Sequence, residues 1–210
     1  MFNYVGQTNV PNEFYGDWSG DSSMSLALIL RRNDTFYYAA DSRCIFTNKD
    51  GTTSIDDMHR KIFCIPTTNT IVIVTGDDVY DDISAEKLIA SSTSVFECEE
   101  KLKQLNISAL IVDKTDDGIY LKKELVSGKS GSFKNDIFCF IGHPNAYNAA
   151  SRFIVPDEAG EEATKDFINW LFSYFIMFPS STERSIGGQI NIFKQEYGHK
   201  PIKLQGWYDL

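Results

Sequence analysis

Apolar and polar positions in the first third of the chain form short runs that are typical of β-strands. Each run is rich in Leu, Ile, Val, Tyr and Thr, and turn-forming residues separate one run from the next. Asn33, Asp34 and Asn69 are residue types that turns favour. The runs are residues 26–30, 35–40, 61–65 and 70–75. This order predicts two β-hairpins in succession.

The hydrophobic period changes after these hairpins. Apolar residues then recur at helical spacing, which predicts two short helices over residues 77–90 and 94–105. Ser94 and Glu97 have the spacing of a capping box at the start of the second helix. Four aspartates open the first helix. Negative charge suits the positive end of a helix dipole, so we predict a solvated helix start there, with no metal and no cofactor.

The second half of the chain also alternates strands with helices. Residues 157–177 carry carboxylates early and nearly continuous apolar residues late, which is typical of a buried helix. The other predicted elements are strands at residues 107–112, 118–121, 136–142, 188–193 and 201–204, and a helix at residues 144–154. This order predicts an α+β fold, a four-layer αββα sandwich, over residues 25–210. Residues 1–24, which are polar and turn-rich, form either an ordered arm or a propeptide.

Composition excludes several classes of function. The net charge of −9 argues against binding to nucleic acid or to an anionic membrane, because both partners need a basic face. No apolar run reaches membrane-spanning length, and the first twenty residues lack the pattern of a signal peptide. The four cysteines are far apart in sequence, with no metal-ligand spacing. We therefore expect a cytoplasmic protein with reduced thiols.

Three charged residues lie at the ends of the predicted strands. Asp41 and Arg43 follow the second strand, and Lys61 opens the third. A Lys flanked by apolar strand residues needs a counter-charge, and Asp41 closes the neighbouring hairpin. This arrangement predicts an internal ion pair between Asp41 and Lys61.

The segment A-A-D-S-R at residues 39–43, followed by R-K-I-F at residues 60–63, resembles proteasome β-subunits and the bacterial HslV peptidase. Those proteins are N-terminal-nucleophile (Ntn) hydrolases, in which a mature N-terminal Thr opens the first strand. Counted back along the first hairpin, that position is Ser25 in this chain. The resemblance implies that Ser25 is the nucleophile. It also implies catalytic roles for Asp41 and Lys61 and a substrate-binding role for Arg43.

Three glycine-containing segments extend the resemblance. Gly76 is at the position whose backbone N–H serves as oxyanion donor, and Gly142, in F-I-G-H-P-N-A-Y, is at a turn before the third helix. The resemblance implies that Gly76 and Gly142 contribute to substrate binding. In T-E-R-S-I-G-G-Q-I-N-I, Glu183 and Ser185 match the supporting Asp and Ser of the family. The likeness covers about residues 25–205.

The resemblance also implies partners. A ring or another homo-oligomer, an unfoldase partner, and a peptide or protein substrate would be expected. Residues 1–24 would be removed by self-cleavage before Ser25, unless they pack on the body as a retained arm.

Three interpretations follow. The first is an Ntn peptidase or amidase that exposes Ser25. The second is an inactive, unprocessed proteasome-fold protein that acts as an assembly or partner-binding scaffold. The third is a serine hydrolase on the same sandwich that needs no processing and uses Lys61 as its base. Cleavage before Ser25 distinguishes the first interpretation from the other two.

Overall fold

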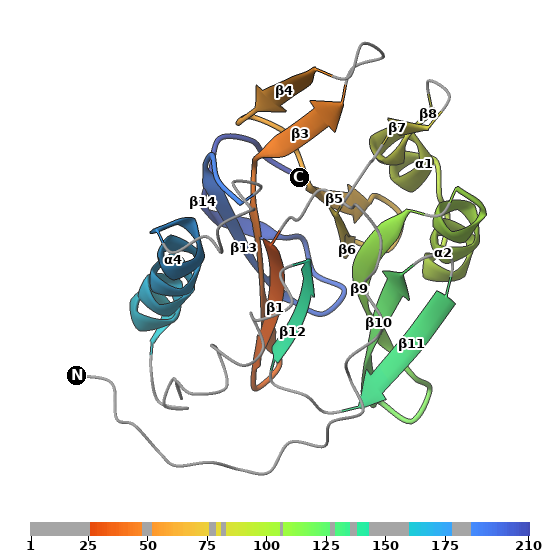
Figure 1. Cartoon of the computed structure of the whole chain (residues 1–210). Helices are drawn as coiled ribbons and strands as arrows, with labels where there is room; N and C mark the ends of the chain where they lie inside the picture. Colours follow the sequence, from red (N-terminus) through yellow and green to blue (C-terminus); the bar gives the residue numbers. More distant parts are fainter. Residues whose placement is uncertain are drawn as a thin grey trace.

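Strands dominate the part of the chain that the structure, a computed structural model, describes: residues 26–47, 52–75, 79–80, 83–105, 107–126, 129–134, 138–142, 160–177 and 186–210. Two five-stranded antiparallel sheets form its centre, and two pairs of short strands form small ribbons (Figure 1).

The first sheet has the order β12-β1-β2-β13-β14 and the second the order β11-β10-β9-β6-β5. The first consists of β1 (Leu26–Arg32), β2 (Thr35–Asp41), β12 (Phe138–Gly142), β13 (Ile190–Glu196) and β14 (Ile202–Gln205). The second consists of β5 (Ile62–Ile65), β6 (Thr70–Thr75), β9 (Ser108–Lys114), β10 (Tyr120–Val126) and β11 (Lys129–Lys134). The ribbons pair β3 (Cys44–Thr47) with β4 (Thr53–Asp56), and β7 (Val79–Tyr80) with β8 (Ile83–Ser84).

Both predicted N-terminal hairpins are confirmed. β1 pairs with β2, and β5 pairs with β6, in antiparallel register. Asn33 and Asn69 lie in the connecting turns with φ of 52° and 53°. Asparagine tolerates this left-handed region better than most residues, which explains its use at both turns.

Residues 26–30 of β1 are buried on both faces, and this explains why these five residues are all apolar. Leu26, Leu28 and Leu30 belong to the cluster that includes α4 (Glu161–Met177), whereas Ala27 and Ile29 belong to the cluster between the two sheets. Side chains alternate between the faces of a strand, so a strand covered on both sides needs apolar residues at every position. Full burial of each leucine contributes about 1.5–3 kcal/mol. The strand that Ser25 precedes is therefore firmly anchored.

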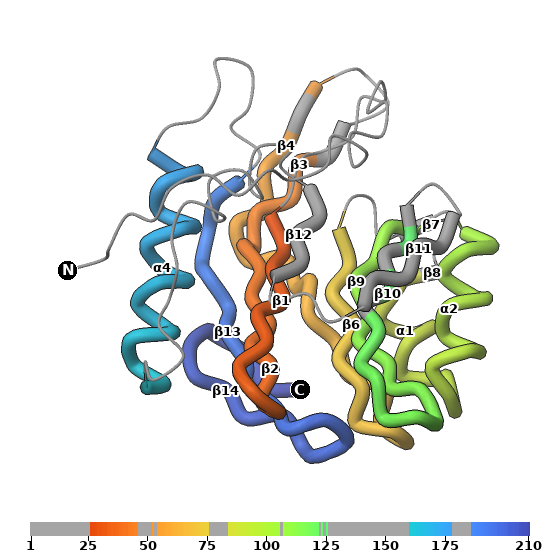
Figure 2. Tube along the Cα trace, turned by 90° about the horizontal axis from the view of Figure 1, so that it is seen from below, coloured from red at the N-terminus to blue at the C-terminus, as the bar shows by residue number. Residues whose placement is uncertain are grey.

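Helices lie only on the outer faces of the sheets in the described part of the chain. α4 packs on the first sheet through Phe167, Leu171 and Phe175. The shorter helices α1 (Ala85–Ala90) and α2 (Val95–Gln104) pack on the second sheet through Ile89 and Leu102. Figure 2 shows the two sheets side by side, with α4 beside one and α1 and α2 beside the other.

The prediction of an α+β four-layer αββα sandwich is wrong. The described residues form a mainly β structure in which one 17-residue helix lies on one side and helices of 6 and 10 residues lie on the other. Of the helix predicted over residues 77–90, Ala85–Ala90 is helical, and the other described residues of this range form the β7–β8 ribbon. The helices therefore cover parts of the sheets without forming complete layers. The helix predicted at residues 144–154 lies outside the described residues.

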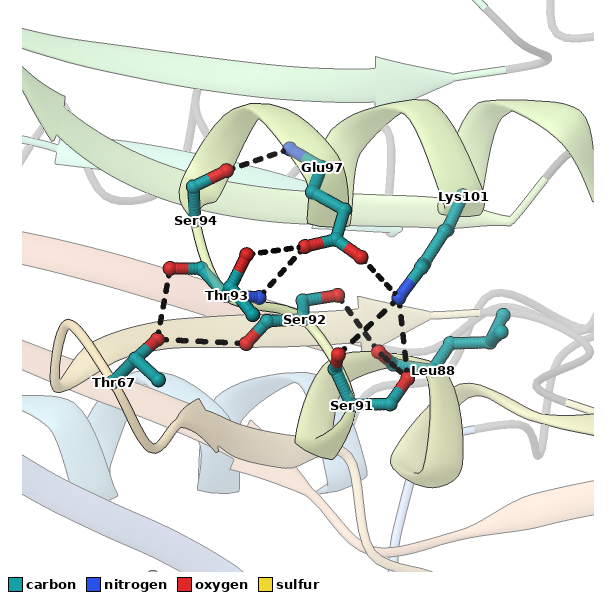
Figure 3. Close-up of polar contacts among 8 residues, drawn as sticks. All are labelled: Thr67, Leu88, Ser91, Ser92, Thr93, Ser94, Glu97 and Lys101. Carbon is teal, nitrogen blue, oxygen red and sulfur yellow. Dashed lines mark hydrogen bonds and ion pairs between the residues drawn. The ribbon is translucent and has the colours of Figure 1, made fainter.

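The capping box predicted at Ser94 and Glu97 is present at the start of α2, except that the Glu97 side chain bonds Thr93 and not Ser94. The Glu97 N–H donates to Ser94 Oγ over 3.1 Å, as in a capping box. The Glu97 carboxylate reaches back past Ser94 and accepts from both the N–H and the hydroxyl of Thr93, at 2.8 and 2.7 Å (Figure 3). Lys101 Nζ lies 2.7 Å from the other carboxylate oxygen of Glu97. These contacts lower the pKa of Glu97 to about 2, and the hydrogen bond from Lys101 is the largest cause.

This lowered pKa predicts an acid-sensitive contribution of Glu97 to stability. Because the folded-state pKa lies below the unfolded value, the contribution is present above about pH 4.3 and is lost as the pH falls toward 2. We expect Glu97→Gln to be less stable than the wild type in urea denaturation at pH 7 and equally stable near pH 2. A stability difference that stays constant across this range would contradict the assignment.

Within the described residues, no helix is both long and apolar enough to cross a membrane. The same part of the chain contains no cluster of three or more His, Cys, Asp or Glu side chains that could hold a metal ion.

Candidate functional site

The centre of the candidate site is the carboxylate of Asp41, at the end of β2. Asp41 is fully buried. Its Oδ1 accepts from the backbone N–H of Leu26 at 3.0 Å and from Lys61 Nζ at 2.9 Å, and its Oδ2 accepts from the N–H of Gly187 at 3.1 Å. The predicted ion pair between Asp41 and Lys61 is therefore present. It is a charge-assisted pair whose carboxylate is also held by two backbone donors.

Lys61 reaches this carboxylate from the other sheet. It directly precedes β5, and its carbonyl accepts from the N–H of Val74 on β6 at 2.8 Å. The residue is 4% exposed, so its ammonium lies in the interior and needs the counter-charge of Asp41. The pair joins the two sheets at the end where β1 begins and β2 ends.

The same carboxylate lies at the start of β1, the strand that follows Ser25 in the sequence. Leu26 N and Lys61 Nζ both lie about 3 Å from the same oxygen of Asp41, so they are no more than about 6 Å apart. Gly142 lies opposite Leu26 in the β1–β12 register. The first residue before β1 is Ser25 itself, which lies outside the described residues.

Ser42 and Arg43 tie this end of β2 to the chain that leads into β13. The N–H groups of both residues donate to the carbonyl of Gly187, at 3.2 and 3.1 Å. Ser42 Oγ accepts from the N–H of Gln189 at 2.7 Å and donates to the carbonyl of Asp57. Ser42 is fully buried, and its hydroxyl acts both as an acceptor and as a donor.

Arg43 is held by Asp57 in a two-point contact. Nε donates to Asp57 Oδ1 at 2.6 Å and Nη2 to Oδ2 at 3.1 Å. The guanidinium lowers the pKa of Asp57, chiefly through this hydrogen bond, and the pKa of Arg43 is raised in turn. The pair closes the base of the β3–β4 ribbon, a stretch whose polar sequence carried no strand signal. The described contacts give Arg43 a role in holding this ribbon, and its substrate-binding role stays a prediction.

The double glycine at residues 187 and 188 is required by close packing. A Cβ on Gly187 would lie 2.4 Å from Arg43 Cζ, and a Cβ on Gly188 would lie 2.4 Å from Ser42 Oγ. Gly188 also has φ of +69°, in the left-handed region. The two glycines stand out in the sequence, but their partners Ser42 and Asp57 do not, because a loop Ser and a loop Asp carry no pattern of their own.

Four of the predicted site residues lie outside the described residues: Ser25, Gly76, Glu183 and Ser185. Two of them border described strands, since Gly76 follows β6 and Ser25 precedes β1. The structure thus brings together Asp41, Lys61, the start of β1 and the end of β12. This arrangement places a buried positive charge next to the N-terminal end of a central strand.

Comparison with known proteins identifies the class of fold. The arrangement of two sheets that face each other is similar to the fold of solved proteasome-like proteins. The particular similar structures are two Anbu proteins. One is an Anbu (Gly-1) mutant from Hyphomicrobium sp. strain MC1, with a TM-score of 0.57, 11% identity, and coverage of 86% of this chain and 87% of that one.

The second similar structure is Anbu from Yersinia bercovieri, described as an ancestral beta-subunit. It has a TM-score of 0.56 and 11% identity, and the match covers 85% of this chain and 86% of that one. No protein-family model matches the sequence, and no curated protein matches it. The expected membership of the proteasome β-subunit and HslV family is therefore wrong as an assignment. The likeness is one of fold alone.

Proposed function

We propose that this chain hydrolyses peptide or amide bonds, with Ser25 as an N-terminal nucleophile that removal of residues 1–24 exposes. The observation that supports this is the shared carboxylate oxygen of Asp41, which holds both the first backbone N–H of β1 and the ammonium of Lys61. A structural ion pair alone would not need to lie against the residue that follows Ser25.

The buried pair suits the chemistry of an N-terminal hydroxyl. The Ser25 hydroxyl attacks the substrate carbonyl while its proton passes to the free α-amine of the same residue. The C–N bond of the substrate then breaks, the amine returns the proton to the leaving nitrogen, and water later releases the acyl group. The ammonium of Lys61 stabilises the developing alkoxide. Its positive charge also favours the neutral form of the α-amine, which is the form that accepts the proton.

Other residues complete the proposed site. The backbone N–H of Gly76 would bind the oxyanion, because a glycine lets the substrate main chain approach closely. Glu183 and Ser185 would support the nucleophile. Gly142 and Arg43 would shape the substrate side, Gly142 from the strand opposite Leu26 and Arg43 through the β3–β4 ribbon.

We also propose that the chain forms a homo-oligomer. The C-terminal turn of α4 supports this, because Tyr174, Ile176 and Met177 are 43%, 37% and 71% exposed. The apolar late part of this helix, which the sequence predicted to be buried, is only partly so: Phe172 and Phe175 face the core, whereas Tyr174, Ile176 and Met177 face outward. Ring closure, an unfoldase partner and a cytoplasmic location stay predictions of the sequence.

Intact mass and N-terminal sequencing of protein purified without an N-terminal tag test the proposed function. We expect loss of residues 1–24 and a new terminus at Ser25, and Ser25→Ala should abolish this processing because the hydroxyl that attacks is gone. Lys61→Met should slow it strongly. A wild-type protein that stays full-length would contradict the N-terminal-nucleophile mechanism.

A second candidate function is an unprocessed scaffold that binds partners. The exposed apolar residues of α4 favour it, since a binding surface needs no free Ser25. A full-length mass together with a stable oligomer would favour this candidate. A full-length protein that still hydrolyses peptides, and loses that activity in Lys61→Met, would instead favour the unprocessed serine hydrolase.

A further inference from the structure

The last residues of the chain cross from the first sheet to the second. After β14 the chain turns at Gly206, which has φ of +122°. A Cβ at this position would lie 2.2 Å from Asn191 Oδ1, and the same oxygen accepts from the N–H of Trp207 at 3.3 Å. Asn191 is 1% exposed and belongs to β13. The turn therefore packs tightly against β13, and this fixes the direction of the chain that leads to Tyr208.

Tyr208, two residues after Gly206, reaches the start of β5. Its hydroxyl accepts from the backbone N–H of Ile62 at 3.1 Å. The ring packs against Phe193, with 5.7 Å between ring centroids, and the residue is 8% exposed. Burial raises the pKa of Tyr208 to about 12, although the N–H groups of Ile62 and Lys61 and the charge of Arg60 act in the opposite direction.

Arg60 is clamped by the same C-terminal segment. Its guanidinium lies 4.8 Å from the ring centroid of Tyr208 and 5.2 Å from that of Phe63. Nη2 donates to the carbonyl of Asp209 at 3.3 Å, and Nη1 donates to Glu86 at 3.0 Å. Cation–π contacts of this geometry, supported by hydrogen bonds, hold a long side chain in one place.

Lys61 thus lies between two residues that the C-terminal segment holds. Arg60 on one side stacks on Tyr208, and Ile62 on the other donates to its hydroxyl, while the Lys61 carbonyl accepts from Val74. A lysine side chain has four rotatable methylene groups and loses much conformational entropy when it is confined. Its ammonium can meet Asp41 reproducibly only if the backbone from which it extends is fixed.

We propose that Tyr208 is a positioning residue for Lys61. Its hydroxyl fixes the backbone at the start of β5 so that the Lys61 ammonium meets Asp41 beside the N-terminal end of β1. The role in catalysis rests on the proposed function, whereas the placement of the ammonium does not. Displacement of a catalytic group by about 1 Å can reduce a rate by about a hundredfold, so a partial loss of this support has a measurable effect.

Tyr208→Phe tests the inference, and Tyr197→Phe is a matched control. Both tyrosines pack with the core cluster between the sheets, and the Tyr197 hydroxyl donates to Asp113 at 3.1 Å, away from Lys61. Two readouts need no activity: amide hydrogen exchange at Ile62, and the NMR resonances of the Lys61 side chain, which Lys61→Arg assigns. The third readout is the rate of processing and, in the mature protein, kcat and KM for a peptide substrate.

In Tyr208→Phe we expect faster exchange at Ile62, shifted Lys61 resonances, and kcat about tenfold lower with KM unchanged, because the ammonium is less well placed while the substrate surface is intact. Tyr197→Phe should leave all three readouts as in the wild type. Unchanged Lys61 resonances and unchanged exchange in Tyr208→Phe would overturn the inference. If the wild type never exposes Ser25, the proposed function fails, and the two NMR readouts still decide whether Tyr208 positions Lys61.

Discussion

Replacement of Asp41 by alanine is expected to lower the free energy of unfolding by about 3–5 kcal/mol. The carboxylate is fully buried, and three donors from distant parts of the chain converge on it: Leu26 N, Lys61 Nζ and Gly187 N. Alanine removes the counter-charge that Asp41 gives to an interior ammonium, and it removes the acceptor of two backbone N–H groups. Each is costly in a site closed to water. The same change should abolish any processing before Ser25.

Urea denaturation of Asp41→Ala, Lys61→Met and the double variant measures this effect. Because the two residues form one pair, the double variant should be much less destabilised than the sum of the two single variants. Glu162→Ala is a suitable control, since this carboxylate is 76% exposed and pairs with Lys165 at 2.6 Å on the surface of α4. We expect that control to change stability by less than about 1 kcal/mol. If Asp41→Ala lost no more stability than the Glu162→Ala control, the buried pair would not support the fold.

Gly188→Ala is expected to destabilise the protein by about 2–4 kcal/mol, the sum of a strained backbone and an overpacked contact. The backbone of Gly188 is in the left-handed region, at φ of +69°. The added Cβ would meet Ser42 Oγ at 2.4 Å and the carbonyl oxygen of Asp57 at 2.6 Å. Neither contact can relax without disturbing the hydrogen bonds of Ser42. The effect should therefore extend to Asp41, and processing should slow as well.

Gly198→Ala separates the two causes. Gly198 has φ of +79°, yet a Cβ there would have no heavy atom within 4 Å. This variant should show the backbone strain alone, about 1–2 kcal/mol, with no effect on processing. Thermal and urea denaturation compare the stability of the two variants, and intact mass compares their processing. Equal losses of stability in the two variants would mean that the contact between Gly188 and Ser42 carries no energy.

The hairpins could be predicted because turn residues mark them locally. The buried Asp41–Lys61 pair could be predicted because its two charges are opposite. Asn33 and Asn69 mark turns by residue type, and a lysine among apolar strand residues requires a carboxylate nearby. The helix over residues 77–90 could not be located in this way, because helical spacing over a short apolar run also suits the strands of a ribbon. This ambiguity at β7 and β8 is one reason why the four-layer prediction failed.

The contacts around Ser42 could not be predicted because they depend on the three-dimensional path of the chain. Ser42, Asp57 and Gly188 are common loop residues, and only the packed structure shows that they share one small space. Tyr208 is a similar case. Nothing in the sequence near the C-terminus indicates that its hydroxyl reaches a backbone N–H 146 residues earlier.

The wide sequence separation of the groups around Asp41 has a consequence for the order of events during synthesis. Gly187, which donates to Asp41, is 146 residues further along the chain, and the contact between Ile62 and Tyr208 spans the same distance. Contacts between such distant segments form late in folding, because a long loop must first be closed. A chain still growing on the ribosome cannot complete this set of contacts until Tyr208 has been added. Chemistry that depends on the assembled site therefore cannot begin before that point in synthesis.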